Sequence, residues 1–305
     1  MPVPFDPNGD ALRDAMRDVI ERHCAAPYQP TAIDGLTLFR IASAAPPNHA
    51  LYNPRLVLVV QGGKQVGFGD LAFRVTTGNF LVVTVDIPVT TQIETTPDGR
   101  PHMALTLSLD RALLAEVLPR VVAEPVATAS PAALDAAPLT ADLLDPFARL
   151  LRLLDTPADI GFVAPLIVRE LYYRLLSGGV GPTLTQFALN SSHVAKIGRV
   201  TEWIKAHYAE PMRIDALAEL AGMSLTSFHR HFKNLTSMTP IQYRTQVRLR
   251  EARRMLISDG EGAGAIGLKV GYESQSQFSR DYKRLFGAPP ASDAGRGAGG
   301  IEKRA

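Results

Sequence analysis

The chain has 305 residues, of which 46% are hydrophobic and 20% are charged, so it can form about two domains with buried cores. Its single cysteine, Cys24, excludes an intramolecular disulfide and a cysteine-based zinc site, as is typical of a reducing compartment. No apolar run reaches the roughly 18 residues of a membrane span, and residues 1–10 carry no basic segment followed by an apolar stretch, so we expect no signal peptide. We therefore expect a cytoplasmic protein that does not enter a membrane.

The formal net charge of +2 conceals an uneven distribution. Residues 193–305 carry 18 Lys and Arg against 11 Asp and Glu, whereas residues 1–192 carry 14 against 19. A basic C-terminal third on an acidic body favours a polyanionic partner for that third.

The N-terminal half predicts a helix followed by strands. From Asp10 to Cys24 apolar residues recur at helical spacing. Short β-rich runs then follow, separated by turn residues such as Gly62-Gly63 and Asp98-Gly99. The predicted strands are Leu36–Ile41, Arg55–Gln61, Gln65–Phe68, Leu71–Val75, Asn79–Val85, Thr90–Thr95 and His102–Ser108. Their number and spacing indicate a β-sandwich or a small barrel.

Residues 109–178 return to a helical period. We expect three helices, around Leu113–Leu118, Leu143–Leu154 and Leu166–Leu175, with 123–140 as a loop and 178–192 as a linker. The apolar helices that follow the strands have two interpretations: they form the contact of a homodimer, or they cover the β-domain as a lid.

The C-terminal third contains a duplicated helix-turn-helix pattern. In the first unit a short helix ends at Gly222, where a tight turn needs a positive φ, and Ser224 caps the next helix. In the second unit Gly271 and Ser274 take the same places. Phe228 and Phe232, like Phe278, Tyr282 and Phe286, form the buried stripe of each second helix, so its other face is left outward.

One continuous helix, Ile241–Ile257, is predicted between the two units. It carries five arginines, and its 17 residues span roughly 25 Å. A spacer of that size could hold two base-contacting helices near the ~34 Å that separates successive major grooves on one DNA face.

These motifs resemble the DNA-binding domain of the AraC/XylS family of bacterial transcription regulators, over residues 196–290. The similarity rests on Ala218–Ser224, Phe228–Lys233, Val270–Phe278 and Lys283–Gly287 with Pro289-Pro290. Residues 14–110 also resemble the N-terminal effector domain of one AraC subfamily, through Asn53–Arg55, Val60–Lys64 and Val85–Val89. That second resemblance implies a cupin-like β-domain.

The resemblance and the two outward helix faces point to one set of DNA-binding residues, which can hydrogen-bond base edges or phosphates. These are Thr226, Ser227, His229, Arg230, Lys233, Gln275, Ser276, Gln277, Arg280 and Lys283. One departure from the family pattern is Gly264-Ala265-Ile266-Gly267, whose glycines weaken the second short helix by about 1 kcal/mol each. We therefore expect the first unit to dominate the affinity for DNA.

Other kinds of site receive little support. His49, Glu94 and His102 are too scattered for a metal site, so we expect no metal and no cofactor. Gly62-Gly63-Lys64 lacks the spacing of a phosphate-binding loop. Cys24 is interpreted as a small buried residue rather than a reactive thiol. No arrangement of catalytic residues is evident, so we do not expect an enzyme.

The sequence thus predicts an α+β protein with a cupin-like β-barrel sensor and flanking helices at 1–190, an all-α DNA-binding domain of two helix-turn-helix units at 191–291, and a disordered tail at 292–305. The predicted function is sequence-specific transcription regulation, with double-stranded DNA, a small-molecule effector and RNA polymerase as partners. Two alternatives are a cupin-type enzyme fused to a DNA-binding domain, and a ligand-independent DNA-binding protein whose N-terminal domain only dimerises.

Overall fold

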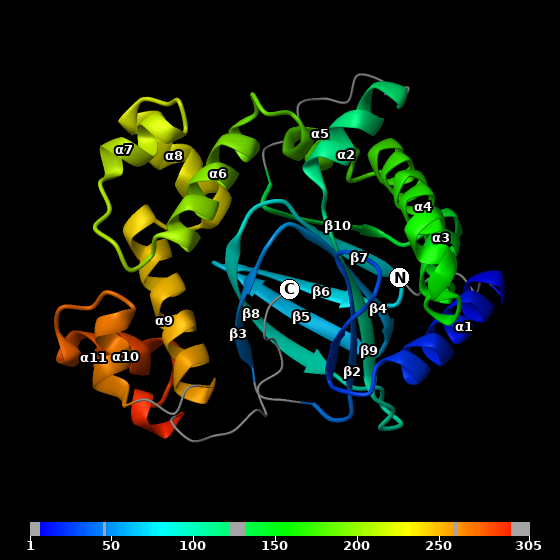
Figure 1. Cartoon of the computed structure of the whole chain (residues 1–305), viewed down its shortest axis with the longest axis horizontal. Helices are drawn as coiled ribbons and strands as arrows, with labels where there is room; N and C mark the ends of the chain where they lie inside the picture. The colour runs from blue at the N-terminus through cyan, green and yellow to red at the C-terminus, as the bar shows by residue number, and fades with distance from the viewer. Residues whose placement is uncertain (1–6, 45–46, 122–131, 259–261, 294–305) are drawn as a thin grey trace.

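The computed structural model describes residues 7–44, 47–121, 132–258 and 262–293, and shows a β-rich N-terminal part beside a helical C-terminal part (Figure 1). The predicted tail lies outside the described residues from position 294 onward. The strands are β1 (Tyr28–Pro30), β2 (Leu36–Ile41), β3 (Asn48–Tyr52), β4 (Arg55–Gln61), β5 (Gly63–Phe68), β6 (Leu71–Thr76), β7 (Asn79–Val83), β8 (Ile87–Glu94), β9 (His102–Ser108) and β10 (Leu134–Pro138).

The helices of the N-terminal part are α1 (Pro7–His23), α2 (Arg111–Val117), α3 (Ala141–Arg152), α4 (Pro157–Ser177) and α5 (Gly181–Ala188). Those of the C-terminal part are α6 (His193–Ala206), α7 (Ile214–Leu220), α8 (Leu225–Thr236), α9 (Pro240–Ser258), α10 (Ala263–Lys269) and α11 (Gln275–Phe286). Single 3₁₀ turns lie at Leu118–Arg120, Leu153–Asp155 and Pro290–Ser292.

The strands form two antiparallel sheets. Sheet A has the order β1-β2-β9-β4-β7-β10, and sheet B has the order β3-β8-β5-β6. One of several crossings between the sheets lies at Gly62, between β4 and β5, where φ is +80°. A closed barrel was expected, but among the described residues the hydrogen-bonded ladders form two separate sheets. Of the two architectures that the strand spacing allowed, the sandwich is the closer description.

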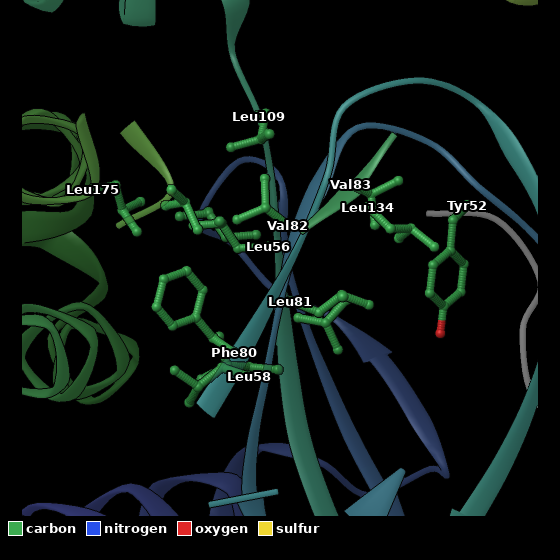
Figure 2. Packing of buried hydrophobic residues seen from close by; sticks show 14 of the residues in the cluster. Tyr52, Leu56, Leu58, Phe80, Leu81, Val82, Val83, Leu109, Leu134 and Leu175 are labelled. Carbon is green, nitrogen blue, oxygen red and sulfur yellow. The ribbon is translucent and has the colours of Figure 1, made fainter. Parts of the chain in front are cut away.

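Each face of sheet A packs against a different neighbour (Figure 2). Leu56 pairs with Val82 and Leu58 with Phe80, and these side chains lie on the side of Leu175 from α4. Leu81, Val83, Leu134 and Tyr52 lie on the other side, between the two sheets. The strands of sheet A are apolar on both faces because helices cover one face and sheet B covers the other.

Helices α3 and α4 pack on each other and, with α1, cover sheet A. This arrangement agrees with the lid interpretation. The outward side of α4 nevertheless exposes Phe162, Leu166 and Tyr173 by 78%, 52% and 46%. Contact with a second copy of the chain therefore stays a prediction. None of the described helices combines the length and the apolar composition that a membrane crossing requires.

The C-terminal part is built around α9, with α7 and α8 near one end and α10 and α11 near the other (Figure 1). At about 1.5 Å per residue, the 19 residues of α9 span about 28 Å. The core of the second unit, from Leu249 to Tyr282, is a separate hydrophobic cluster. Phe228, Phe232 and Tyr243 instead belong to the same cluster as the β-domain core. The first unit is therefore the one that shares its core with the N-terminal part.

Candidate DNA-binding surface

Helices α8 and α11 begin with the same capping arrangement. The Ser224 hydroxyl accepts a hydrogen bond from the backbone N–H of Ser227 at 3.4 Å, and the Ser274 hydroxyl accepts one from Gln277 at 3.3 Å. Gly222 and Gly271 precede these caps with φ of +59° and +90°. At Gly271 an added Cβ would lie 2.5 Å from the carbonyl oxygen of Ala209, so glycine is required there for space as well as for φ. The predicted turns and caps are confirmed.

The predicted stripes separate the two sides of each helix. Phe228, Phe232, Phe278 and Tyr282 are fully buried, whereas Phe286 is partly exposed. Nine of the ten predicted DNA-binding residues are exposed, and Ser227, which donates to the Ser224 cap, is partly buried. The exposed residues are Thr226, His229, Arg230, Lys233, Gln275, Ser276, Gln277, Arg280 and Lys283. Their role in binding DNA stays a prediction.

Two histidines in α8 have different surroundings. His229 is exposed, whereas His231 is partly buried and stacks on His193 of α6, with ring centroids 3.8 Å apart. Burial, followed by the neighbouring His193 and Arg230, lowers the pKa of His231. The stacked His231 attaches α8 to α6, which leaves His229 as the histidine of α8 available to a ligand.

The arginines of α9 bind carbonyl and carboxylate oxygens of the fold and do not form a shared outward-facing basic surface. Arg248 donates from Nε to the carbonyl oxygen of Tyr208 at 2.7 Å, and Arg244 donates to that of Glu210 at 3.3 Å. Arg253 forms an ion pair with Asp293 at 3.1 Å, and Arg254 forms one with Glu251 at 2.6 Å. Much of the basic excess in the sequence is therefore used within the fold, and the outward positive charge is concentrated on α8 and α11.

The second short helix accommodates its glycines through close packing. An added Cβ at Gly267 would lie 2.9 Å from Cδ1 of the buried Phe278, so α10 approaches α11 more closely than alanine would allow. At Gly264 the nearest atom is Nε2 of Gln275, at 3.2 Å. Gly267 is thus a packing residue as well as a weak helix former. The weaker contribution of the second unit to DNA affinity stays a prediction.

The β-domain packs against the helical C-terminal part through strands β3 and β8. Lys205 of α6 donates to the buried Asp86 carboxylate at 2.6 Å, and the Tyr243 hydroxyl of α9 donates to the Asp86 carbonyl at 2.9 Å. Burial raises the pKa of Asp86, and Lys205 opposes that shift. Arg250 of α9 donates from Nε to the carbonyl oxygen of Ala50 at 3.1 Å.

Strand β3 also contacts the second helix-turn-helix unit. The ring of His49 on β3 lies edge-on to Phe286 of α11, with centroids 5.3 Å apart. Burial and the nearby Arg250 and Arg253 lower the pKa of His49 to about 4. The sequence analysis did not predict that His49 and Asp86 contact the C-terminal helices, although Asp86 lies in the Val85–Val89 motif that supported the resemblance.

The three residues considered as metal ligands lie in different surroundings. His49 packs against α11, whereas His102 is buried on β9 and Glu94 is bound by Arg74 at 2.8 Å. Within the described ranges, no three His, Cys, Asp or Glu residues lie together as metal ligands would. Cys24 is buried, and burial raises its pKa to about 11.

Comparison with known proteins agrees with this arrangement. A model of the AraC-type transcriptional regulator N-terminus matches residues 32–183, and a helix-turn-helix domain model matches residues 217–294. The chain belongs to the AraC/XylS family. The first match extends beyond the strands into α3 and α4, so these helices are part of the AraC-type N-terminal domain.

Curated relatives agree with this membership, and a solved structure has a similar fold. The chain is 33% identical over 112 residues to the HTH-type transcriptional regulator ArgR of Pseudomonas aeruginosa, and 29% identical over 144 residues to the HTH-type transcriptional activator RhaS of Salmonella paratyphi B. These alignments cover 37% and 47% of this chain, and 34% and 51% of those relatives. ToxT of Vibrio cholerae bound to an unsaturated fatty acid has a similar fold, with a TM-score of 0.56 at 9% identity over 88% of this chain and 97% of that chain.

Proposed function

We propose that this AraC/XylS-family chain is a sequence-specific DNA-binding transcription regulator whose β-domain binds a small-molecule effector. The observation that carries the proposal is the pair α8 and α11. The two helices share one capping arrangement, are joined through α9, and expose arginine, glutamine and hydroxyl side chains. Such side chains hydrogen-bond base edges in the major groove, while neighbouring lysines bind phosphates.

The proposed domains are those expected from the sequence: a sensor at 1–190, a DNA-binding domain at 191–291 and a tail at 292–305. Asp293 is buried, and it accepts a hydrogen bond from the Tyr282 hydroxyl at 2.7 Å. Residues 292 and 293, at the start of the proposed tail, therefore pack against the second helix-turn-helix unit. The two packed sheets of the sensor form a container of cupin type, which is the finer fold that we propose for it.

Strands β3 and β8 provide a physical route from effector to DNA. Tyr52 on β3 pairs with Ile87 on β8, and both side chains are buried. Along the same strands, Ala50 contacts α9, and Asp86 immediately before β8 contacts α6 and α9. An effector that binds the two positions of these strands unequally would change the population of DNA-competent arrangements.

The proposed partners follow from this function. Double-stranded DNA is the primary partner, and RNA polymerase is the machinery on which a transcription regulator acts. A second copy of the chain is a further proposed partner, and the cytoplasm is the proposed location. The matched relatives are described as a transcriptional regulator and an activator, so neither the fused enzyme nor the ligand-independent alternative is favoured.

The test is selection of bound sequences from a library of random duplexes by the full chain. Arg230→Ala and Arg280→Ala should each weaken binding to the selected site by about 1–3 kcal/mol and relax base preference in a different half of it. Arg152→Ala removes the same charge from an exposed position on α3, in the other domain, and should change neither property. Unchanged affinity and preference in both helix variants would refute the assignment of these two faces.

A further inference from the structure

Helices α8 and α11 are equivalent position by position, at an offset of 50 residues along the chain. Each helix has 12 residues and begins after a serine cap, Ser224 in one and Ser274 in the other. Each ends at a residue in the left-handed region, with φ of +56° at Ser237 and +78° at Gly287. Because both ends of the helices correspond, every residue of α8 has a structural counterpart in α11.

The first residue of each helix has no chemical likeness to its counterpart. Helix α8 begins with Leu225, whereas α11 begins with Gln275. The exposed fraction of Leu225 is 50%, and Gln275 is exposed as well. One helix therefore presents an apolar side chain to solvent where the other presents an amide. Other pairs keep the same residue, namely Phe228 and Phe278, Arg230 and Arg280, and Lys233 and Lys283.

Leu225 lies on the outward side of α8. Its apolar neighbours along the chain pack inward, because Met223 is partly buried against the hydrophobic core and Phe228 is fully buried in it. Residues four apart lie on the same side of a helix, so Leu225 is one turn before the exposed His229. The half-exposed leucine is therefore next to the residues that we propose to bind DNA.

The charge of α8 favours DNA as the molecule that covers Leu225. None of its twelve residues is Asp or Glu, and Arg230 and Lys233 are exposed. A surface of this kind attracts a polyanion rather than an apolar protein partner. The N-terminal residues of a recognition helix are those that contact base edges in the major groove. As the first residue of α8, Leu225 occupies such a position.

We propose that Leu225 contacts the C5-methyl group of a thymine in the half of the DNA site that α8 binds. The inference rests on the proposed DNA-binding function and adds one base preference to it. Leucine offers no hydrogen bond, and the thymine methyl is the apolar group that base edges present in the major groove. Gln275, at the equivalent position of α11, can instead form two hydrogen bonds with adenine. The two halves of the site should therefore differ in sequence although Arg230 and Arg280 are shared.

The experiment replaces thymines by deoxyuridine, which lacks only the C5-methyl group. The duplex is one that the full chain selects from random sequences, and the half examined is the one in which Arg230→Ala relaxes base preference. Each thymine in that half is replaced in turn, and affinity is measured by fluorescence anisotropy at one salt concentration. One replacement should weaken binding by the unaltered chain about three- to fivefold, as expected for the loss of one buried methyl group.

Three variants identify the residue. Leu225→Ala should bind the thymine and deoxyuridine duplexes equally, and Leu225→Gln, which keeps the length of the side chain, should also lose the difference. Leu268→Ala makes the same chemical change at a position of α10 that is 67% exposed, and it should keep the full difference. Urea unfolding should give all three variants a stability close to that of the unaltered chain, because both leucines are on the surface.

A converse substitution tests the same contact by adding a methyl group. With a cytosine·guanine pair at the identified position, methylation of the cytosine at C5 should strengthen binding by the unaltered chain. The same methylation should leave binding by Leu225→Ala unchanged.

The inference is overturned if the selected half contains no thymine, if no deoxyuridine replacement weakens binding, or if Leu225→Ala keeps the difference between the two duplexes. Each of these results would leave the proposed DNA-binding function intact, since the selected duplex is still bound. A folded chain that binds no duplex would instead overturn the proposed function, and this inference with it.

Discussion

The contact between Asp86 and Lys205 predicts unequal effects of removing each partner. The Asp86 carboxylate has a relative exposure of 1%, and it depends on Lys205 of α6 at 2.6 Å. Lys205→Met leaves this buried charge without its cation. Breaking a buried pair in that way costs roughly 3–5 kcal/mol. Since 40% of the Lys205 side chain is exposed, solvent screens part of the interaction, and we expect a loss of about 2 kcal/mol.

Asp86→Asn should be milder, because burial already disfavours the charged form of Asp86 and raises its pKa. The asparagine oxygen can still accept from Lys205, so the expected cost is below about 1 kcal/mol. The double variant lacks the unpaired charge and should be more stable than Lys205→Met by about 1 kcal/mol. The magnitude of the coupling energy in the double-mutant cycle is that recovery plus the cost of Asp86→Asn alone.

Urea unfolding followed by tryptophan fluorescence measures these differences. Trp203 is the single tryptophan of the chain, lies on α6 two residues before Lys205, and stacks on His207 with centroids 4.5 Å apart. It therefore reports on the helix that carries the contact. Lys196→Met removes a charge from the same helix away from Asp86 and is the matched control.

The pH dependence gives a second readout. A carboxyl whose pKa is raised by folding binds protons more tightly in the native state, so its contribution to stability is present at low pH and is lost as pH rises through the native pKa. Lys205→Met removes the opposing cation and raises the pKa of Asp86 further. The deficit of Lys205→Met relative to the unaltered chain should therefore shrink as pH falls below neutrality. A deficit no larger than that of Asp86→Asn, or no recovery in the double variant, would refute the reasoning.

Three further predictions concern single positions. Gly264→Ala should stabilise the chain by up to about 1 kcal/mol through helix propensity, because the atom nearest to the added Cβ is the end of an exposed side chain. Gly267→Ala should destabilise the chain, because the added Cβ would lie 2.9 Å from the buried Phe278. Urea unfolding measures both changes in the free energy of unfolding, and changes of the same sign would contradict the packing argument. Ser224→Ala should cost about 1 kcal/mol by removing the cap of α8 in the same assay, and no measurable loss would contradict the capping role. Cys24, whose pKa burial raises to about 11, should react with iodoacetamide at pH 8 far more slowly in the native chain than in urea, and fast native labelling would show the thiol to be accessible.

Strong local patterns made part of the fold predictable from the sequence. Leu36–Ile41, Arg55–Gln61 and His102–Ser108 have the expected bounds, since each is a run of β-forming residues ended by turn or polar residues. β3 and β10 were missed because Asn48–Tyr52 and Leu134–Pro138 have weak strand propensity, and each is defined by pairing with a neighbour.

The region between the domains was also predicted incorrectly, because its local sequence does not show its tertiary contacts. Gly181–Ala188 was expected to be part of the linker 178–192, yet it forms α5. Leu184 and Phe187 are fully buried, so packing rather than propensity stabilises this short helix. Tertiary contacts that the sequence does not display determine such elements.

Some residues of the candidate sites could be predicted from the nearby sequence, whereas others could not. The outward residues of α8 and α11 follow from caps, glycines and aromatic spacing, all within about twelve residues of each other along the chain. Asp86 lies in a motif that the sequence analysis noticed, but its contact with α6 depends on Lys205, which is distant along the chain. The positive charge along α9 was visible, whereas its use by backbone carbonyls of other segments was not.

The most direct test of the central claim is fluorescence-anisotropy binding of the full chain to a duplex selected from random sequences, across a salt series with random DNA as competitor. A DNA-binding regulator should bind the selected duplex specifically, with an asymmetric site whose two halves lie about one helical turn apart, and log affinity should fall steeply and linearly with log salt. Folded protein that binds no duplex at any salt concentration would contradict the account.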